Sequence, residues 1–152
     1  MANPNSVGEL YLDSFGNAKI AFASGVSMAA LGNAVANLCI VSGGLTNGGA
    51  VSNSGAVIIR KVVATSLNGS VSSANVTITT SNDGNASNAV VSQVTLSGIS
   101  AAGTFQDLPI ASPYTTTVLS GKTSSTLFVN VTTASGNTNT VNFSVYGDVV
   151  SF

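Results

Sequence analysis

The side chains that could carry out chemistry are few, and their types exclude most catalytic arrangements. The sequence contains no histidine, which excludes Ser-His-Asp and Cys-His nucleophilic centres and histidine-based metal sites. Two carboxylates about 5–10 Å apart could hydrolyse a glycoside, but nothing in the spacing of the acids predicts such a pair. The five acids are Glu9, Asp13, Asp83, Asp107 and Asp148. We therefore expect no enzymatic activity, no catalytic residue and no small-molecule substrate.

Motifs for metals, phosphates and cofactors are also missing. The segment SNDGNASN, residues 81–88, is rich in oxygen ligands but lacks the spaced acids and terminal Glu of an EF-hand, so it predicts a turn. The stretch SGGLTNGG lacks the Gly-Lys-Ser/Thr of a phosphate-binding loop. A single cysteine, Cys39, cannot form an intramolecular disulfide and is interpreted as a small buried hydrophobe. We expect no cofactor and no metal.

Charge is scarce, and this limits the possible partners. Only 6% of the residues are charged, against about 25% in an ordinary soluble domain. The net charge of -1 offers no field for nucleic acid, whose binding needs clustered Lys and Arg. The mean hydropathy is +0.44, but no run of about 18 apolar residues predicts a membrane span. Low charge also gives little repulsion between copies, which favours a protein that is packed into an assembly.

The N-terminal stretch lacks the basic region and apolar core of a secretory signal. We therefore expect the chain to be made in a cytoplasm.

Two of the four positive charges, Arg60 and Lys61, lie side by side inside the apolar run VIIRKVV. In a regular strand, Lys61 would share a face with Ile59, and Arg60 would share the other face with Val62. The two charges are therefore expected to point to opposite sides, and the one on the core side needs a strand end or an acidic partner. One of them could form an inter-subunit salt bridge. Alternatively, they could belong to a solvated edge that blocks strand pairing.

The elements that must position these residues are predicted to be strands. Val, Ile and Thr are frequent, and turn clusters separate the apolar stretches every 8–15 residues, a spacing typical of sandwiches and barrels. Asn68-Gly69 and Asp83-Gly84 are predicted turns. Strands are predicted at 18–24, 56–65, 74–80, 89–97, 104–108, 116–120, 126–132 and 138–150. One helix is predicted at 26–38 from its Ala, Leu and Met content, and the following NLCIV is expected to continue as a strand.

Apolar residues alternate with polar ones in several of these strands, which indicates antiparallel sheets with one buried face. The residues expected to face inward are Val76, Ile78, Leu127, Val129, Val131, Val141, Phe143 and Val145. Those expected on the outer face include Asn75, Thr77, Thr79, Asn142, Ser144, Tyr146 and Asp148. We predict an all-β, antiparallel sandwich, specifically a jelly roll, forming a single domain at 18–152. An extended N-terminal arm, residues 1–17, precedes it.

Three stretches carry a resemblance to a known family. They are IIRKVVATSLNGSVSSANVTITTSNDG, VVSQVTLSGISAAGTFQDLPIA and TLFVNVTTASGNTNTVNFSVYGDVV. Their Val/Thr strands, Asn-Gly and Ser-rich turns and closing Val-Tyr-Gly strand resemble the small β-sandwich head-decoration (cement) proteins of tailed bacteriophages. The resemblance covers about residues 56–150. It implies a homotrimeric structural protein on the capsid exterior of the virion, bound to the major capsid protein and stabilising the shell.

The contact residues expected from this interpretation lie in the arm and at the charged pair. An arm with Leu, Tyr and Phe must bury them against the capsid, a neighbouring subunit or its own sandwich. The candidate interface residues are Asn3, Pro4, Leu10, Tyr11, Leu12, Phe15, Arg60 and Lys61. Two alternatives remain: a minor capsid, tail or fibre component, and a carbohydrate-binding β-sandwich. In the latter, Tyr114, after Pro113, would be the best sugar platform.

Overall fold

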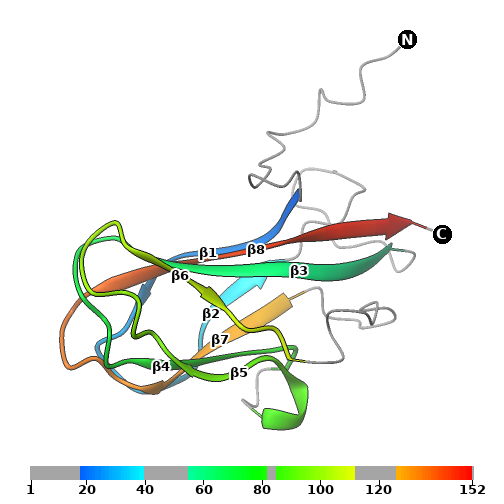
Figure 1. Ribbon diagram of the computed structural model, residues 1–152. Helices are drawn as coiled ribbons and strands as arrows, with labels where there is room; N and C mark the ends of the chain where they lie inside the picture. The colour runs from blue at the N-terminus through cyan, green and yellow to red at the C-terminus, as the bar shows by residue number, and fades with distance from the viewer. Residues whose placement is uncertain (1–17, 40–54, 82–84, 112–125, 152) are drawn as a thin grey trace.

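The computed structural model describes residues 18–39, 55–81, 85–111 and 126–151, which form eight strands and one short 3-10 helix (Figure 1). The strands are β1 (Ala18–Ser27), β2 (Gly32–Cys39), β3 (Gly55–Ser66), β4 (Asn75–Thr79), β5 (Ala89–Thr95), β6 (Phe105–Leu108), β7 (Thr126–Thr133) and β8 (Thr140–Ser151). The helix η1 is Ala86–Asn88. The predicted all-β class is confirmed. The predicted arm at 1–17, the strand at 116–120 and the Asp83-Gly84 turn lie outside the described residues.

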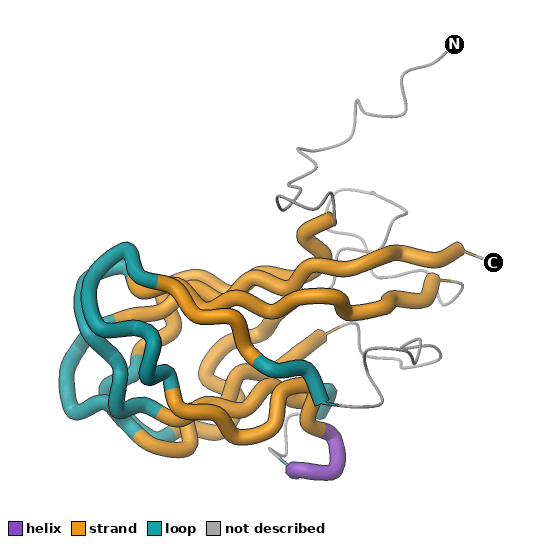
Figure 2. The backbone as a smooth tube through the Cα atoms, in the orientation of Figure 1, coloured by secondary structure: helices purple, strands orange, loops and turns teal. Residues whose placement is uncertain are grey.

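The strands form two antiparallel sheets that face each other (Figure 2). Sheet A has the order β1-β8-β3-β6, and sheet B has the order β2-β7-β4-β5. Four of the pairs are those of one long hairpin, in which the first strand meets the last and so on inward. They are β1 with β8, β2 with β7, β3 with β6 and β4 with β5. Two more pairs, β3–β8 and β4–β7, complete the sheets. This is the connectivity of an eight-stranded jelly roll, as predicted.

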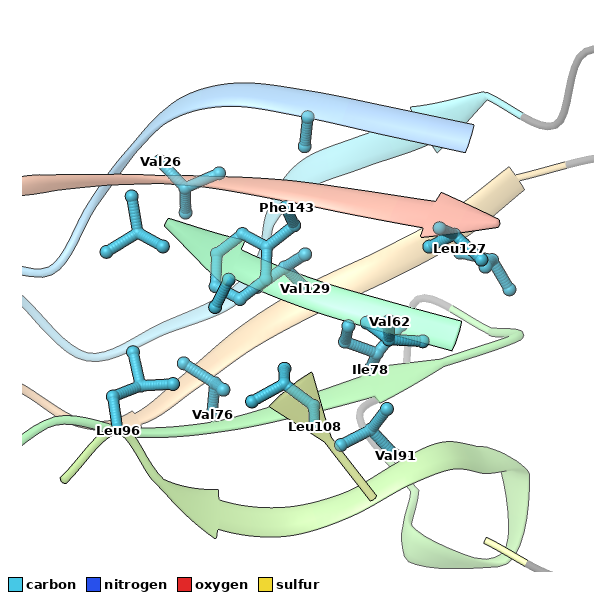
Figure 3. Close-up of a cluster of buried hydrophobic side chains, with 14 of the residues drawn as sticks. Val26, Val62, Val76, Ile78, Val91, Leu96, Leu108, Leu127, Val129 and Phe143 are labelled. Carbon is cyan, nitrogen blue, oxygen red and sulfur yellow. The ribbon is translucent and has the colours of Figure 1, made fainter. Parts of the chain in front are cut away.

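One hydrophobic cluster fills the space between the sheets (Figure 3). Sheet A contributes Val62 and Phe143, and sheet B contributes Ile78 and Val129, all at most 1% exposed. Complete burial of a side chain of this size contributes about 1.5–3 kcal/mol. The predicted inward residues of β7 and β8 are all in this cluster, which confirms their alternation.

The predicted helix at 26–38 is wrong. Strand β1 continues to Ser27, a bend follows, and β2 begins at Gly32. Helix propensity is a weak preference that tertiary contacts override, and here β1 pairs with β8 and β2 pairs with β7. Met28, at the bend, is fully buried, and its main chain bonds to the β7–β8 loop at Asn139 and Ser135. The expectation that a strand includes Leu38 and Cys39 is confirmed for the described residues.

The expectation of one buried face is wrong for β4. Val76 and Ile78 face the core, but Thr79 on the opposite face is also fully buried and Thr77 is 9% exposed. Asn130 of β7 lies opposite Thr77 and is itself 2% exposed. Its Nδ2 donates to the Thr79 Oγ1 at 3.0 Å, and the Thr79 hydroxyl donates to the Ser81 carbonyl at 2.7 Å. The outer side of sheet B therefore contains a buried cluster of hydroxyl and amide groups.

Uncharged polar side chains also join the loops at one end of the sandwich. The Ser70 carbonyl accepts hydrogen bonds from the side-chain amides of Asn137 and Asn139, both at 2.9 Å. The Asn68 Oδ1 accepts from the Thr140 backbone N–H at 2.8 Å, and the chain bends at residues 67–69, where a turn was predicted. A Cβ at Gly69 would lie 2.5 Å from the Asn139 Nδ2, so a larger residue there would displace the amide that donates to the Ser70 carbonyl. Asn68, Asn137 and Asn139 thus bond within the fold.

Candidate functional site

The charged residues of the strands all belong to one sheet. Sheet A contains Lys19 in β1, Arg60 and Lys61 in β3, Asp107 in β6 and Asp148 in β8. The four strands of sheet B, as the structure describes them, contain no charged residue. In a chain with only 4 Lys+Arg, three of these cations therefore meet on one sheet. This concentration makes the outer side of sheet A the candidate functional site, which we call the sheet A face.

A β-bulge places both charges of the Arg60-Lys61 pair away from the core. Ile59 pairs with Gly147 and Lys61 pairs with Tyr146, the next residue along β8, so Arg60 is an extra residue in β3. Arg60 is exposed, and the Lys61 side chain is 28% exposed.

The expectation that one charge points toward the core is therefore wrong. The extra residue also lets Ile59 and Val62, three positions apart, both face the core, each 1% exposed. An apolar strand thus carries two adjacent charges without burying either in the core.

Lys19 and Lys61 flank Tyr146 in a single row across three strands. Tyr146 of β8 pairs with Lys19 on one side and with Lys61 on the other. The Lys19 ammonium lies 4.8 Å from the centroid of the Phe22 ring and 5.9 Å from that of Tyr146. Such distances allow cation–π attraction, worth about 0.5–1 kcal/mol at exposed sites. The row presents two ammonium groups with an aromatic ring between them.

The next row crosses all four strands and ends in an acid. Register pairs join Phe22 to Ser144, Ser144 to Val63, and Val63 to Asp107. Phe22 on β1 is 42% exposed, whereas Ser144 and Val63 in the middle are half-buried. The Asp107 Oδ1 lies 3.7 Å from the Lys61 Nζ, so the two rows are joined by an ion pair.

A third row continues the face without charge. Asn142 of β8 pairs with Thr65 of β3, and Thr65 pairs with Phe105 of β6. Phe105 is 64% exposed, so each outer strand of sheet A carries one exposed phenylalanine. The Asn142 Oδ1 accepts from the Gly25 N–H at 2.8 Å, where β1 has an irregular register and Gly25 has a φ of +63°.

The sheet A face is suited to recognition of another surface. Aromatic residues and arginine are enriched in protein interfaces, and long cationic side chains can contact both apolar groups and carboxylates. No group of three or more His, Cys, Asp or Glu side chains that could hold a metal occurs within the described ranges. In those same ranges, no helix is long and apolar enough to cross a membrane.

Two of the residues predicted from the sequence lie at this site, and several that form it were missed. Arg60 and Lys61 belong to the sheet A face, whereas the predicted arm residues and Tyr114 lie outside the described residues. Sequence reasoning missed Lys19, Phe22 and Phe105, and it assigned Tyr146 only to an outer face. The one signal in the sequence was that Lys19 is the second residue of the predicted strand at 18–24, and only the register shows that it meets Tyr146.

Comparison of the chain with protein-family models, with curated proteins and with solved structures found no match.

Proposed function

We propose that this chain is a structural virion protein that decorates and stabilises a tailed-phage capsid, acting as a homotrimer on the capsid exterior. The observation that carries the proposal is a charge-poor jelly roll whose strand charges and exposed phenylalanines gather on one sheet face. Jelly rolls occur among viral capsid and lectin domains. The proposed partners are the major capsid protein and other copies of this chain. No catalytic step, cofactor, nucleic acid or membrane is part of the proposal.

The physical chemistry of a decoration protein supports this assignment. A subunit that remains in an assembly needs little charge to stay soluble, and this chain has 6% charged residues. A capsid offers many identical sites, so that several weak contacts from one oligomer add to a stable attachment. Exposed aromatic rings such as Phe22 and Phe105 supply such contacts when another surface covers them.

The first test is the absolute molar mass of the purified protein, by light scattering after size exclusion. A trimer has three times the 15.0 kDa mass of the chain. The second test is deletion of the gene from the virus that encodes the chain. We expect particles that assemble but release their genome at a lower temperature, and purified protein added back should restore the wild-type release temperature.

The copy number in purified particles separates decoration from the alternatives. Many copies, in proportion to the capsid protein, support decoration, whereas a few copies indicate a minor capsid, tail or fibre component. Absence from particles rejects a virion function.

A carbohydrate-binding module is the second candidate, because Phe22, Phe105 and Tyr146 place aromatic rings on one sheet face, and sugars stack on such rings. Glycan-array binding that is lost in Phe22→Ala would favour this alternative.

A further inference from the structure

We infer that Asn68 is a modification site that the folded chain keeps closed. Its side chain converts to aspartate or isoaspartate only when the loop end opens, by which we mean residues 66–70, 101–104 and 135–140 at one end of the sandwich. Gly69 follows Asn68, and peptides with Asn-Gly lose ammonia readily because glycine has no Cβ to shield its nitrogen. The closed site is independent of the proposed function, because it depends only on bonds within one chain.

The reaction joins two groups of the same dipeptide. The backbone nitrogen of Gly69 attacks the side-chain Cγ of Asn68, so that a new N–Cγ bond closes a succinimide ring and the Cγ–Nδ2 bond breaks. The proton of the Gly69 nitrogen leaves with the amide group as ammonia. Water then opens the ring at Cγ to give aspartate, or at the backbone carbonyl to give isoaspartate. The Asn68 side chain is exposed, so burial does not keep water from it.

The attacking nitrogen is held in a hydrogen bond that leaves its proton in place. The Gly69 N–H donates to the Ser66 Oγ at 3.1 Å, and the Ser66 hydroxyl donates in return to the Gly69 carbonyl. A neutral hydroxyl is too weak a base to remove an amide proton, so this bond fixes the nitrogen without activating it. Ser66 is 2% exposed, and its main chain bonds to Thr104 and Gly103 before β6, which keeps it in place.

The side chain that would be attacked is held on the neighbouring strand. The Asn68 Oδ1 accepts from the Thr140 backbone N–H at 2.8 Å and from the Thr140 hydroxyl at 3.4 Å. The preceding peptide is fixed to the same residue, because the Leu67 N–H donates to the Thr140 carbonyl at 3.1 Å. Ring closure swings the Asn68 Cγ onto the Gly69 nitrogen, and this movement carries the Oδ1 away from Thr140.

A second amide packs against Gly69 and is itself bonded. A Cβ at Gly69 would lie only 2.5 Å from the Asn139 Nδ2, which shows how closely this amide approaches the glycine. The Asn139 Nδ2 donates to the Ser70 carbonyl at 2.9 Å, and the Asn137 Nδ2 donates to the same carbonyl at 2.9 Å. The residues on both sides of the dipeptide are therefore tied to the β7–β8 loop and to β8. Reaction at Asn68 requires several of these bonds to break together, which is local unfolding of the loop end.

The experiment ages the full-length chain in the folded state and in guanidinium chloride, in the same neutral buffer at the same temperature. Trypsin places Asn68 and the asparagine of the other Asn-Gly dipeptide, Asn47, on separate peptides, 62–122 and 20–60. Mass spectrometry with fragment-ion sequencing measures conversion at each site. In guanidinium chloride we expect Asn68 and Asn47 to convert at similar rates. In the folded chain we expect Asn68 to convert at least about tenfold more slowly, because at least two hydrogen bonds must open.

A matched pair of serine variants tests whether the protection belongs to the bonds at this dipeptide. Ser66→Ala removes the acceptor of the Gly69 N–H, so the folded variant should convert Asn68 about threefold faster than the wild type or more. Ser135→Ala is the control, because the Ser135 hydroxyl donates to the Met28 carbonyl at 3.0 Å in the same loop end. Its conversion rate at Asn68 should stay within about twofold of the wild type. Melting curves show that both variants are folded at the ageing temperature.

Three results would overturn the inference. The first is conversion of Asn68 as fast in the folded chain as in guanidinium chloride. The second is faster conversion in the folded chain, which would mean that the donors on the Oδ1 activate the amide. The third is an equal increase in both serine variants, which would assign the protection to global stability. If Ser66→Ala does not fold, amide hydrogen exchange in the wild type decides: slow exchange of the Gly69 N–H supports the closed site, and unprotected exchange rejects it.

Discussion

The outer sides of the two sheets use polar residues in opposite ways. On sheet B, Thr79 and Asn130 are short, uncharged and buried, and the Asn130 Nδ2 donates to the Thr79 Oγ1. On the sheet A face, Lys61 and Tyr146 are long, only partly buried, and able to contact a further surface. The difference shows that the polar groups of one side are bonded inside the jelly roll, whereas the other side carries its charged and aromatic groups at its surface.

This contrast predicts that substitutions on sheet B change folding stability, whereas those on sheet A change association. The largest effect on stability is expected for Asn130→Ala, which removes the donor to the Thr79 Oγ1 and leaves a cavity. The free energy of unfolding should fall by about 2–3 kcal/mol in chemical denaturation. Asn75→Ala is the control, because the Asn75 Nδ2 donates to the Thr133 Oγ1 between the same two strands at a more exposed position. Equal losses of unfolding free energy in Asn130→Ala and Asn75→Ala would contradict the contrast between the two sheets.

Two threonines of β4 should respond with opposite sign. Thr79→Val removes a hydroxyl that both donates and accepts, so the free energy of unfolding should fall by about 1–2 kcal/mol. The buried Thr77 Oγ1 has no hydrogen-bond partner within the described part of the chain, so Thr77→Val should leave stability unchanged or raise it by up to about 1 kcal/mol. Thermal unfolding of the two variants side by side measures the difference. A larger loss of stability in Thr77→Val than in Thr79→Val would mean that the Thr77 hydroxyl has a hydrogen-bond partner.

The ion pair on sheet A should contribute little to stability. Lys61 and Asp107 are 3.7 Å apart, and the Asp107 side chain is 59% exposed, so water screens the attraction. A double-mutant cycle with Lys61→Met and Asp107→Asn should give a coupling energy below about 1 kcal/mol. A coupling above about 2 kcal/mol would assign the pair a role within the fold and weaken the contrast between the sheets.

The smallest change in stability is expected at the exposed phenylalanine of β6. Phe105→Ser alters a side chain that is 64% exposed, so the free energy of unfolding should change by no more than about 0.5 kcal/mol. Leu67→Ser, at a 48% exposed residue beyond the end of β3, is the control for loss of an exposed apolar group. If the sheet A face binds a partner, Phe105→Ser should weaken binding to capsids or to other copies more than Leu67→Ser does.

Local pattern was sufficient to predict most of the strands. Seven of the eight predicted strands fall on observed ones, within one to two residues at most ends, because alternating Val, Ile and Thr bounded by turn residues have few other stable arrangements. The eighth, at 116–120, lies outside the described residues. The helix failed because Ala, Leu and Met set only a weak preference, which pairing with β7 and β8 overrides.

The sequence by itself determined an all-β chain with alternating strands, few charges and no histidine chemistry. Only the tertiary structure decided where the charges meet. Lys19 and Tyr146 become neighbours because the jelly roll pairs the first strand with the last. The bulge at Arg60 depends on the partner strand, because Arg60 is an extra residue only in that β8 has no residue opposite it. Strand pairing between distant segments is set by the packing of the whole core, and local sequence does not encode it.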